Sequence, residues 1–317
     1  MRGGPTRVVG RLVAAAATLA LAAILVTAAA DALADPAAMA LGTGAPPAEV
    51  ERLRAAWGLD RPWALRLGER LGGLLVGDLG SSRVRGAPVA GLVAAALPPS
   101  LAYALPGTLL ATLLGVTGGL AAARRRGGAV DRLRVAGSTA LMSVASVVLV
   151  VLVHQVLAFR LGLFPLVGWP LAGSEEAWLG YALLPALVWA LCLVGPEVRH
   201  YRAIFVAGLA APHLDGLRAR GIGEGAILVH AMRGAAAPVL ARVVSRVPPT
   251  LAGGVVVEYV FNIPGLGGLT IAAVKSGDLD LLAGIAVAVA AVTIVADAAA
   301  DLRAARLDPR LAAGEGA

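Results

Sequence analysis

Long apolar runs separated by short polar segments form the dominant pattern of this chain. Six apolar runs predict membrane spans, at about residues 12–30, 101–123, 136–157, 178–194, 247–261 and 281–300. About 20 helical residues at roughly 1.5 Å each cross a hydrocarbon core of ~30 Å. The pattern therefore predicts an all-α integral membrane protein with six transmembrane helices.

The composition agrees with a membrane protein. Of the 317 residues 58% are hydrophobic and 15% are charged, whereas a soluble domain carries about 25% charged residues. The net charge of +7 comes almost wholly from arginine, since Lys275 is the only lysine. The arginines fall between apolar runs, with no basic patch of interleaved aromatics, so nucleic acid is a poor explanation. Because Cys192 is the single cysteine, no intramolecular disulfide can form, and we interpret Cys192 as a small buried hydrophobic residue.

The arginines also orient the spans. They flank four segments: Arg2, Arg7 and Arg11; Arg124, Arg125, Arg126, Arg132 and Arg134; Arg218, Arg220 and Arg233; Arg303, Arg306 and Arg310. Cytoplasmic segments carry the excess of Lys and Arg. The pattern therefore places these four segments, which are the two terminal tails and two internal loops, on the cytoplasmic side.

The first apolar run has two interpretations. A basic start, an apolar stretch and the small residues Ala32-Leu33-Ala34 are typical of a cleaved secretory signal. A run of this length is also typical of an uncleaved first span. Composition does not decide between them.

An external region is predicted between the first two spans. Residues 48–57 and 63–75 have helical patterns, and residues 77–82 form a turn-rich loop. The expected organisation is residues 1–30 as tail and first span, 31–100 as an external helical region, and 101–317 as the core.

The most polar stretch of the second half runs from Asp215 to Pro238. Asp215–Arg220 is predicted as a short helix that stops at Gly221, and a second helix runs from Glu224 to Arg233. Two helices around a glycine turn would make a rigid cytoplasmic knob. The alternative is an ordinary solvated loop.

No catalytic motif is present. The chain lacks His-Glu-x-x-His, Gly-x-Ser-x-Gly and the Gly-x-x-x-x-Gly-Lys-Ser/Thr phosphate loop, so we expect no ATPase site. The four histidines are scattered, no metal site is expected, and His154 is interpreted as an inter-helix hydrogen-bonding residue. Glu258, Asp297 and Asp301 lie near span ends. Carboxylates within a membrane indicate a functional role by default, and exposure at the interface or a partner such as Arg246 is the alternative.

Five stretches in order carry a family resemblance: residues 47–62, residues 72–81 with Leu97-Pro98 after them, residues 255–268, Ser276-Gly-Asp278, and Leu307-Asp-Pro-Arg310. Together they resemble the first of two permease subunits in ATP-binding-cassette (ABC) importers of the dipeptide, oligopeptide and nickel type. The resemblance implies a type I importer fold with six spans and an uncleaved first helix.

The resemblance also implies which residues matter. The coupling loop, residues 213–225, would dock on an ATPase subunit through Asp215, Gly216, Leu217, Arg218, Ala219, Arg220, Gly221, Ile222, Gly223 and Glu224. The family signature near span five would be Glu258, Phe261, Pro264, Gly265 and Gly267. The external loop would be Gly77, Asp78, Leu79 and Gly80.

The resemblance implies a non-enzymatic permease subunit of the bacterial inner membrane. Its partners would be a second homologous permease, two ATPase subunits that bind ATP and Mg, and an external substrate-binding protein. The chain would hold no cofactor. Peptides are the leading substrate class, with nickel or another small solute as an alternative. A membrane-embedded enzyme, and a non-transporting scaffold or sensor derived from this family, are the readings from other classes.

The chain differs from the family at several positions. Asp215 and Gly216 are unusual at the start of the coupling helix, and the interval from Gly221 to Pro238 is shorter by one residue. Arg242 and Arg246 lie where the family is mostly apolar, and span three lacks the usual Pro. These differences are typical of a divergent member.

Overall fold

The structure is a computed structural model, and it describes residues 17, 20, 21, 24, 35–42, 44–170, 178–246, 250 and 254–307. The predicted first span and the tail beyond Leu307 lie almost wholly outside these residues. The described residues of Met1–Ser100, Leu251–Val255 and Pro264–Val295 form one compact unit, which we call unit 1. Those of Leu101–Thr250, Val256–Ile263 and Ala296–Ala317 form unit 2.

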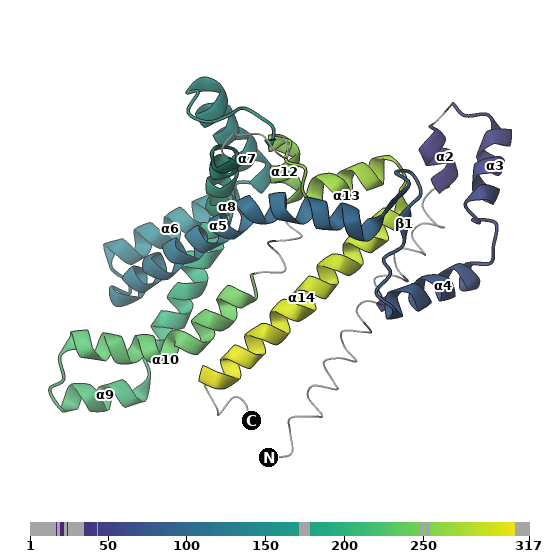
Figure 1. Cartoon of the computed structure of the whole chain (residues 1–317). Coiled ribbons are helices and arrows are strands. Elements are labelled where there is room, and N and C mark those ends of the chain that lie inside the picture. Colours follow the sequence, from purple (N-terminus) through teal and green to yellow (C-terminus); the bar gives the residue numbers. More distant parts are fainter. Residues whose placement is uncertain are drawn as a thin grey trace, which may run out of the picture. The chain divides into compact units, whose positions relative to one another are not determined.

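The described residues of unit 1 contain four short helices, a hairpin and parts of longer helices (Figure 1). Its elements are α2 (Pro36–Leu41), α3 (Pro47–Ala56), α4 (Trp63–Leu75), β1 (Ser81–Ser82), β2 (Ala87–Pro88), the first residues of α5 (Val89–Arg124), α13 (Leu266–Lys275) and most of α14 (Leu279–Leu307). The predicted helices at 48–57 and 63–75 are confirmed as α3 and α4. The two-residue antiparallel hairpin was not expected, because two residues per strand are too few for alternation to be visible.

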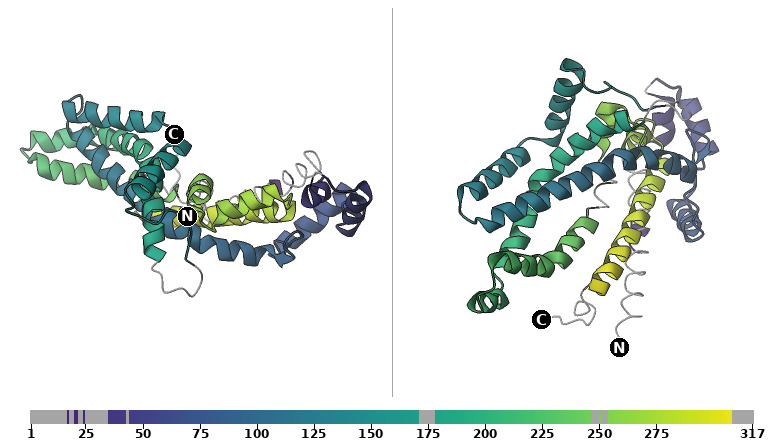
Figure 2. Two further views of the ribbon diagram at one scale, coloured as in Figure 1. Left: turned by 90° about the horizontal axis from the view of Figure 1, so that it is seen from above. Right: turned by 60° about the vertical axis from the view of Figure 1, so that its left-hand side comes forward.

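Unit 2 contains the remaining helices, seen from two further directions in Figure 2. They are the rest of α5, α6 (Ala129–Ser143), α7 (Ser146–His154), the π-helical turn η1 (Gln155–Arg160), α8 (Trp178–Leu209), α9 (Pro212–Ala219), α10 (Glu224–Val244) and α12 (Val255–Phe261), which begins in unit 1.

The predicted third span, residues 136–157, corresponds to two helices that meet at a bend. The chain breaks after Ser143, and α6 meets the α7–η1 helix at 92°. Before the break, the Thr139 hydroxyl donates to the Val135 carbonyl and the Ser143 hydroxyl to the Thr139 carbonyl. Such back-bonding competes with the helix ladder and often bends a helix.

Three helices run beyond their predicted ends. α5 begins at Val89 rather than Leu101, α8 continues to Leu209, and α10 continues past Arg233 to Val244. α8 contains Pro185 and Pro196, and α10 contains Pro238. Proline is tolerated in membrane helices because neighbouring groups satisfy the backbone that it frees, so proline was a poor guide to where these helices end.

The described residues include three helices long and apolar enough to cross a membrane: α5, α8 and residues 224–243 of α10. The count rises to five if α6 with α7–η1, and α12 with α13, are each taken as one interrupted span. The apolar part of α14, Leu279–Val295, is shorter.

α5 and α8 pack at close range within unit 2. A Cβ atom on Gly107, Gly115 or Gly119 would lie 2.6 Å from an atom of α8, namely the Ala186 carbonyl, the Glu197 Cβ and the Arg202 amide nitrogen respectively. Small residues let two membrane helices approach in this way. The close contact fixes α8 against α5, and the segment between α8 and α10 follows directly from the end of α8.

Candidate functional site

The short helix predicted at Asp215–Arg220 is present as α9 (Pro212–Ala219), which begins three residues earlier and ends as expected before Gly221. Gly221 has φ +75°, its amide donates to the Arg218 carbonyl (2.9 Å), and the Ile222 amide donates to the Leu217 carbonyl (3.2 Å). These two bonds and the packing of Ile222 beside Leu217 make a Schellman cap. The cap requires a left-handed residue, which is why glycine stands at position 221.

One face of α9 is buried against α10. Leu214 of α9 has no exposed surface and packs with Ile227 and Ala231 of α10. The other face exposes Asp215, Gly216 and the charged side chain of Arg218. We call α9 with the connecting residues 220–223 and the first turns of α10 the α9 tip.

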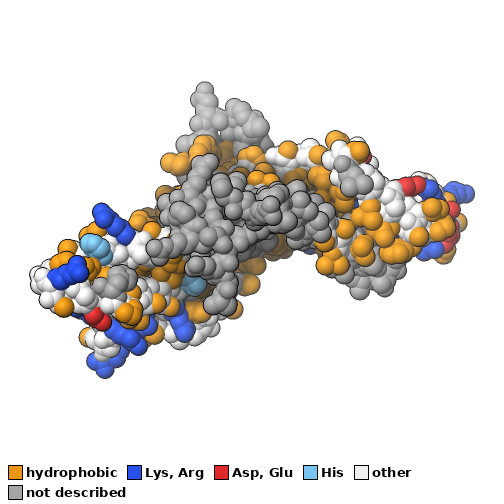
Figure 3. All heavy atoms as spheres, turned by 90° about the horizontal axis from the view of Figure 1, so that it is seen from below, with side chains coloured by type: hydrophobic (Ala, Val, Ile, Leu, Met, Phe, Trp, Pro, Cys, Tyr) orange, Lys and Arg blue, Asp and Glu red, His pale blue; other side chains and the backbone are white. Residues whose placement is uncertain are grey.

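The exposed face of the tip carries surface charges. Arg218 pairs with Asp215 (2.8 Å) and Glu224 (3.4 Å), and its hydrogen bond to Asp215 raises the pKa of the guanidinium. Lys and Arg side chains gather over the left of the face drawn in Figure 3. Exposed arginines of this part of unit 2 are Arg124, Arg125, Arg126, Arg220 and Arg233. A short helix with an apolar underside and a charged outer face is suited to docking on another protein.

A buried charge cluster joins α8 to α10. Glu197 of α8 is 1% exposed and accepts hydrogen bonds from Arg242 (Nη2–Oε1, 2.9 Å) and from Arg246. We call Glu197, Arg242 and Arg246 the charge triad. The expectation that Arg246 pairs with a carboxylate of spans five or six is corrected here, since its partner is Glu197.

A second charge pair joins α6 to α8. Arg202 forms a two-pronged contact with Asp131, at 2.5 and 2.7 Å, and the Gly127 amide donates to Asp131 (2.9 Å). The sequence showed Asp131 only as a lone acid among arginines. Its burial beside Arg202, 71 residues away in the chain, was not accessible from local pattern.

Glu258 is buried, which corrects the expectation of interface exposure. The side chain is 1% exposed and accepts a hydrogen bond from the Tyr103 hydroxyl of α5 (3.2 Å). The Ile263 amide donates to the Glu258 carbonyl (2.9 Å), and Asn262 between them has φ +52°. Glu258 therefore stabilises the end of α12.

Phe261 anchors the external loop after η1. Its ring contacts the ring of His154 edge to face, with centroids 4.9 Å apart, and its carbonyl accepts from the Gly168 amide (3.0 Å). His154 also bonds the Leu166 carbonyl (2.6 Å) through Nε2. The hydrogen-bonding role predicted for His154 is thus directed to loop backbone rather than to another helix.

The rest of the signature lies in unit 1. Gly265 and Gly267 are buried and Pro264 is exposed. The amide of Leu266, at the start of α13, donates to the Ser100 hydroxyl of α5 (2.8 Å). The glycines therefore belong to the junction of α13 with α5 rather than to a phosphate loop.

The external loop of unit 1 is a tight turn that packs on α14. Gly77 and Gly80 both have φ +80°, and the Gly80 amide donates to Asp78 Oδ1 (2.8 Å). Leu79 packs with the cluster of Val89, Leu281 and Ile285. The apolar packing and the turn together fix the start of the hairpin.

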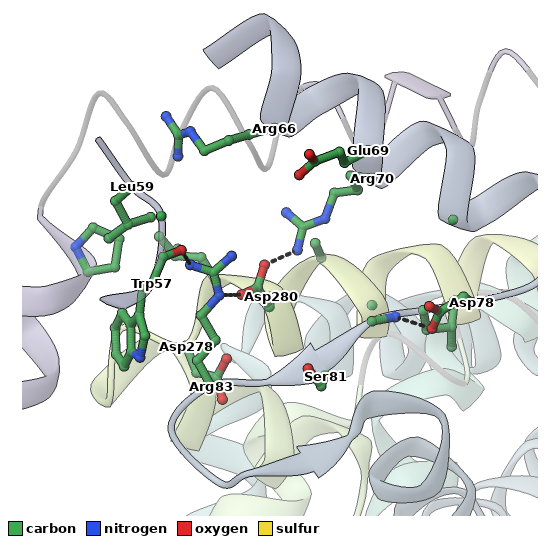
Figure 4. A pocket seen from close by; sticks show the side chains of 18 of the residues that line it. Trp57, Leu59, Arg66, Glu69, Arg70, Asp78, Ser81, Arg83, Asp278 and Asp280 are labelled. Carbon is green, nitrogen blue, oxygen red and sulfur yellow. Dashed lines mark hydrogen bonds and ion pairs between the residues drawn. The ribbon is translucent and has the colours of Figure 1, made fainter. Parts of the chain in front are cut away.

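Two acids at the start of α14 hold the external elements. Asp280 pairs with Arg70 of α4 and with Arg83 of the hairpin (2.6 Å), as Figure 4 shows. The Ser82 hydroxyl donates to the buried Asp278. We call these contacts the external clamp. Beside them lies a cavity of about 310 Å³ lined by residues that include Trp57, Leu59, Arg66, Glu69, Arg70, Arg83 and Asp280.

A further buried polar cluster of unit 2 is made by Trp189, Thr108 and Thr250. The Trp189 ring nitrogen donates to the Thr108 hydroxyl (3.0 Å), which lies 3.1 Å from the Thr250 hydroxyl. These three side chains hold no acid or base, as a nucleophilic site needs. Within the described ranges, no three His, Cys, Asp or Glu side chains gather as metal ligands.

Comparison with known proteins adds an independent line. A family model described as the binding-protein-dependent transport system inner membrane component matches residues 115–313. The chain is 31% identical over 279 residues to a putative peptide transport system permease protein of Brucella abortus, covering 87% of this chain and 89% of that protein.

Two further relatives are similar over most of their length. A glutathione transport system permease protein of Pectobacterium atrosepticum is 32% identical over 249 residues, or 78% of this chain and 79% of the relative. A dipeptide transport system permease protein of Lactococcus lactis is 28% identical over 267 residues, or 84% of this chain and 86% of the relative.

Proposed function

This chain belongs to the family of binding-protein-dependent transport system inner membrane components, and from that premise we propose that it is the permease subunit of an ATP-driven importer of short peptides. The observation that carries the proposal is the similarity to a peptide permease over 87% of the chain. The two other relatives are named for glutathione and for dipeptides, which are themselves short peptides.

The proposed topology has six spans with both termini in the cytoplasm. The proposal takes five of the candidates as spans two to six: α5, α6 with α7–η1, α8, α12 with α13, and the apolar part of α14. It leaves α10, which is also long and apolar enough to cross a membrane, in the internal segment between α8 and α12. The apolar run at residues 12–30 supplies the first span. The proposed division keeps residues 1–30 as tail and first span, 31–100 as the external region and 101–317 as the core.

The proposed coupling element is α9. It is attached to α8 through residues 210–211 and to α10 through residues 220–223, and its inner face is packed on α10. A push on its charged outer face would reach both long helices as one rigid-body movement. The chain itself hydrolyses nothing, and two partner ATPase subunits supply the energy.

The proposed partners on the other side are an external binding protein and a second, homologous permease. The external region of residues 48–82 is the proposed docking surface for the binding protein. Its support is the exposed face of α3 and α4, which present charged side chains around the cavity beside the external clamp.

Co-purification in mild detergent from the native host tests this function. Mass spectrometry should find a second six-span permease, ATPase subunits and a binding protein with the chain. The reconstituted complex should take up radiolabelled short peptides only with ATP. Purification of the chain alone or with unrelated proteins, or uptake independent of ATP, would contradict the proposal.

Replacement of Gly221 by leucine tests the coupling role of α9. The left-handed conformation at Gly221 disfavours a side chain by about 1–2 kcal/mol, so the Schellman cap and the orientation of α9 should be lost. We expect peptide uptake to fall at least tenfold while the chain still enters the membrane. Gly180→Ala on α8 is the matched control, because a Cβ there meets no atom within 4 Å, favours helix and lies outside the coupling loop. Unchanged uptake in Gly221→Leu would contradict the coupling role.

A further inference from the structure

Five exposed arginines lie close together in the turn that joins α5 to α6, residues 124–134, which we call the arginine turn. The only acid in this turn, Asp131, is buried and already engaged by Arg202 of α8 and by the Gly127 amide. Within the part of the chain that the structure describes, none of the five arginines forms an ion pair. The turn therefore presents positive charge that the described residues do not neutralise. Its arginines are Arg124, Arg125, Arg126, Arg132 and Arg134.

Apolar chain lies on both sides of the arginine turn. No Asp, Glu, Lys or Arg occurs in residues 101–123 before it or in residues 135–159 after it. Residues 101–123 are helical in α5, and about 23 helical residues at ~1.5 Å each cover the ~30 Å of a hydrocarbon core. When α5 crosses the membrane, Arg124 therefore emerges at the depth of the lipid headgroups.

Local packing holds the arginine turn in one shape. Gly127 has φ +76° and its amide donates to Asp131 (2.9 Å), while the Gly128 amide donates to the Arg125 carbonyl (2.9 Å). Arg134 of α6 lies against α5, because a Cβ atom on Gly118 would be 3.3 Å from its Nη1 atom. Basic side chains held between two membrane helices in this way are typical of sites for anionic headgroups.

An exposed leucine in the same turn also fits a lipid surface. Leu133 is 75% exposed, and both of its neighbours in the chain are arginines. At the boundary of the hydrocarbon core a leucine reaches the acyl chains, while arginines beside it extend toward the phosphates. The α9 tip differs, because its Arg218 is paired with Asp215 and Glu224. Its mixed charge suits a protein surface, whereas the uniform charge of the arginine turn suits phosphate groups.

We propose that the arginine turn binds the phosphate groups of anionic phospholipids in the leaflet at which α5 ends. A basic side chain near an anionic membrane surface contributes about fivefold to binding, so several together select an anionic headgroup over a zwitterionic one. Bound lipid holds the end of α5 and the start of α6 at the membrane surface. The inference goes beyond the proposed function, because it requires only the membrane location that the family establishes.

A fluorophore beside the turn can measure which lipid lies there. The label is attached to Ala129→Cys, an exposed position, in a Cys192→Ala background, and the full-length chain is reconstituted in phosphatidylcholine vesicles. A small fraction of either phosphatidylglycerol or phosphatidylcholine carries a nitroxide near the top of one acyl chain and quenches the fluorophore. We expect the association constant of phosphatidylglycerol to be at least tenfold the higher, and the preference to fall as salt screens the charges.

Paired substitutions show whether the preference belongs to the turn. Arg124→Gln with Arg125→Gln leaves Arg134 on α5 in place and should lower the preference at least fivefold. The matched control, Arg220→Gln with Arg233→Gln, removes the same charge from other exposed positions of unit 2 and should keep the preference. Arg124→Lys with Arg125→Lys retains the charge and should keep most of the preference, which separates lost charge from a misfolded turn.

Equal quenching by the two labelled lipids in the parent chain would overturn the inference. A preference that survives in the double glutamine variant, or that falls equally in the control, would also overturn it. If the turn shows no lipid preference and becomes protected from hydrogen exchange only when ATPase subunits bind, its ligand is a protein and the inference is wrong. The quenching measurement uses the chain alone, so its outcome is independent of the co-purification that tests the transport function.

Discussion

The hairpin of α8, α9 and α10 and the external elements of unit 1 are held together by different kinds of contact. In the hairpin, Leu214, Ile227 and Tyr201 have no exposed surface, and even the charge of Glu197 is buried. In the external elements, α3 has no buried residue at all. Its neighbour α4 is attached through arginines, one paired with Asp280 and another, Arg61, with Glu69.

The difference teaches what each region is suited to do. Of the ion pairs that attach α4, the Arg61–Glu69 pair is exposed and contributes roughly 0–1 kcal/mol, whereas the Arg70–Asp280 pair is partly buried. α3 and α4 therefore have few buried contacts that oppose a local rearrangement. Buried apolar layers and buried charges allow few arrangements, so α8, α9 and α10 form the more rigid of the two regions.

The largest effect should come from filling the contact between α5 and α8. Gly119→Leu would drive its side chain into the backbone of Tyr201 and Arg202, which cannot move aside. We expect a loss of about 3 kcal/mol, because overpacking of a tight core costs about 1–3 kcal/mol or more. Thermal unfolding in detergent measures the loss. Gly137→Leu on α6, where a Cβ meets no atom within 4 Å, is the control and should leave the transition nearly unchanged.

A smaller and local effect should follow from breaking the external clamp. Asp280→Asn removes the negative charge shared by Arg70 and Arg83, and we expect a loss of about 0.5–1 kcal/mol. Hydrogen exchange should become faster in α4 and in the β1–β2 hairpin, and remain unchanged in α8 and α10. Asp60→Asn, at an exposed position, is the control. Faster exchange throughout unit 2 would contradict the contrast between the two regions.

The smallest effect concerns pH at α2. Burial raises the pKa of Asp35, but hydrogen bonds from Arg54 and from the Ala37 amide outweigh it and lower the pKa below its usual value. A lowered pKa contributes stability at neutral pH that is lost as the pH falls through the folded-state value. We expect the amides of α2 to lose protection between about pH 5 and pH 2, after correction for intrinsic exchange.

Asp35→Asn should remove that pH dependence and leave the protection of α8 unaltered. If α2 kept the same pH dependence in the variant, another group would be responsible for it.

Local signals were sufficient for several elements. Pro47 at the start of α3 and the glycine at position 221 each act within one turn of helix, so their effect could be predicted from neighbouring residues. α4 was predicted with its bounds intact, because its apolar positions repeat with helical spacing. The exposed face of α9 followed from its charged residues.

Other features depended on contacts between distant segments. Arg246 was offered as a partner for carboxylates of spans five and six, but it pairs with Glu197, which is 49 residues away. The position of a residue near the end of a span does not show which helix it faces. Glu258 was expected at an interface, but Tyr103 lies 155 residues away and completes its burial. Two arginines four apart beside an apolar stretch were the available signal that a buried acid must lie opposite.

The spacing of small residues on α5 determines which substitutions each face of this helix can accept. Gly107, Ala111, Gly115 and Gly119 recur every fourth residue, and Ala111 has no exposed surface. The intervening Leu109 and Leu113 are 63% and 60% exposed. One stripe of the helix is closed to any larger residue, while the opposite stripe accepts one aliphatic side chain for another. We therefore expect substitutions to be strongly restricted along the buried stripe of α5 and tolerated along the exposed stripe.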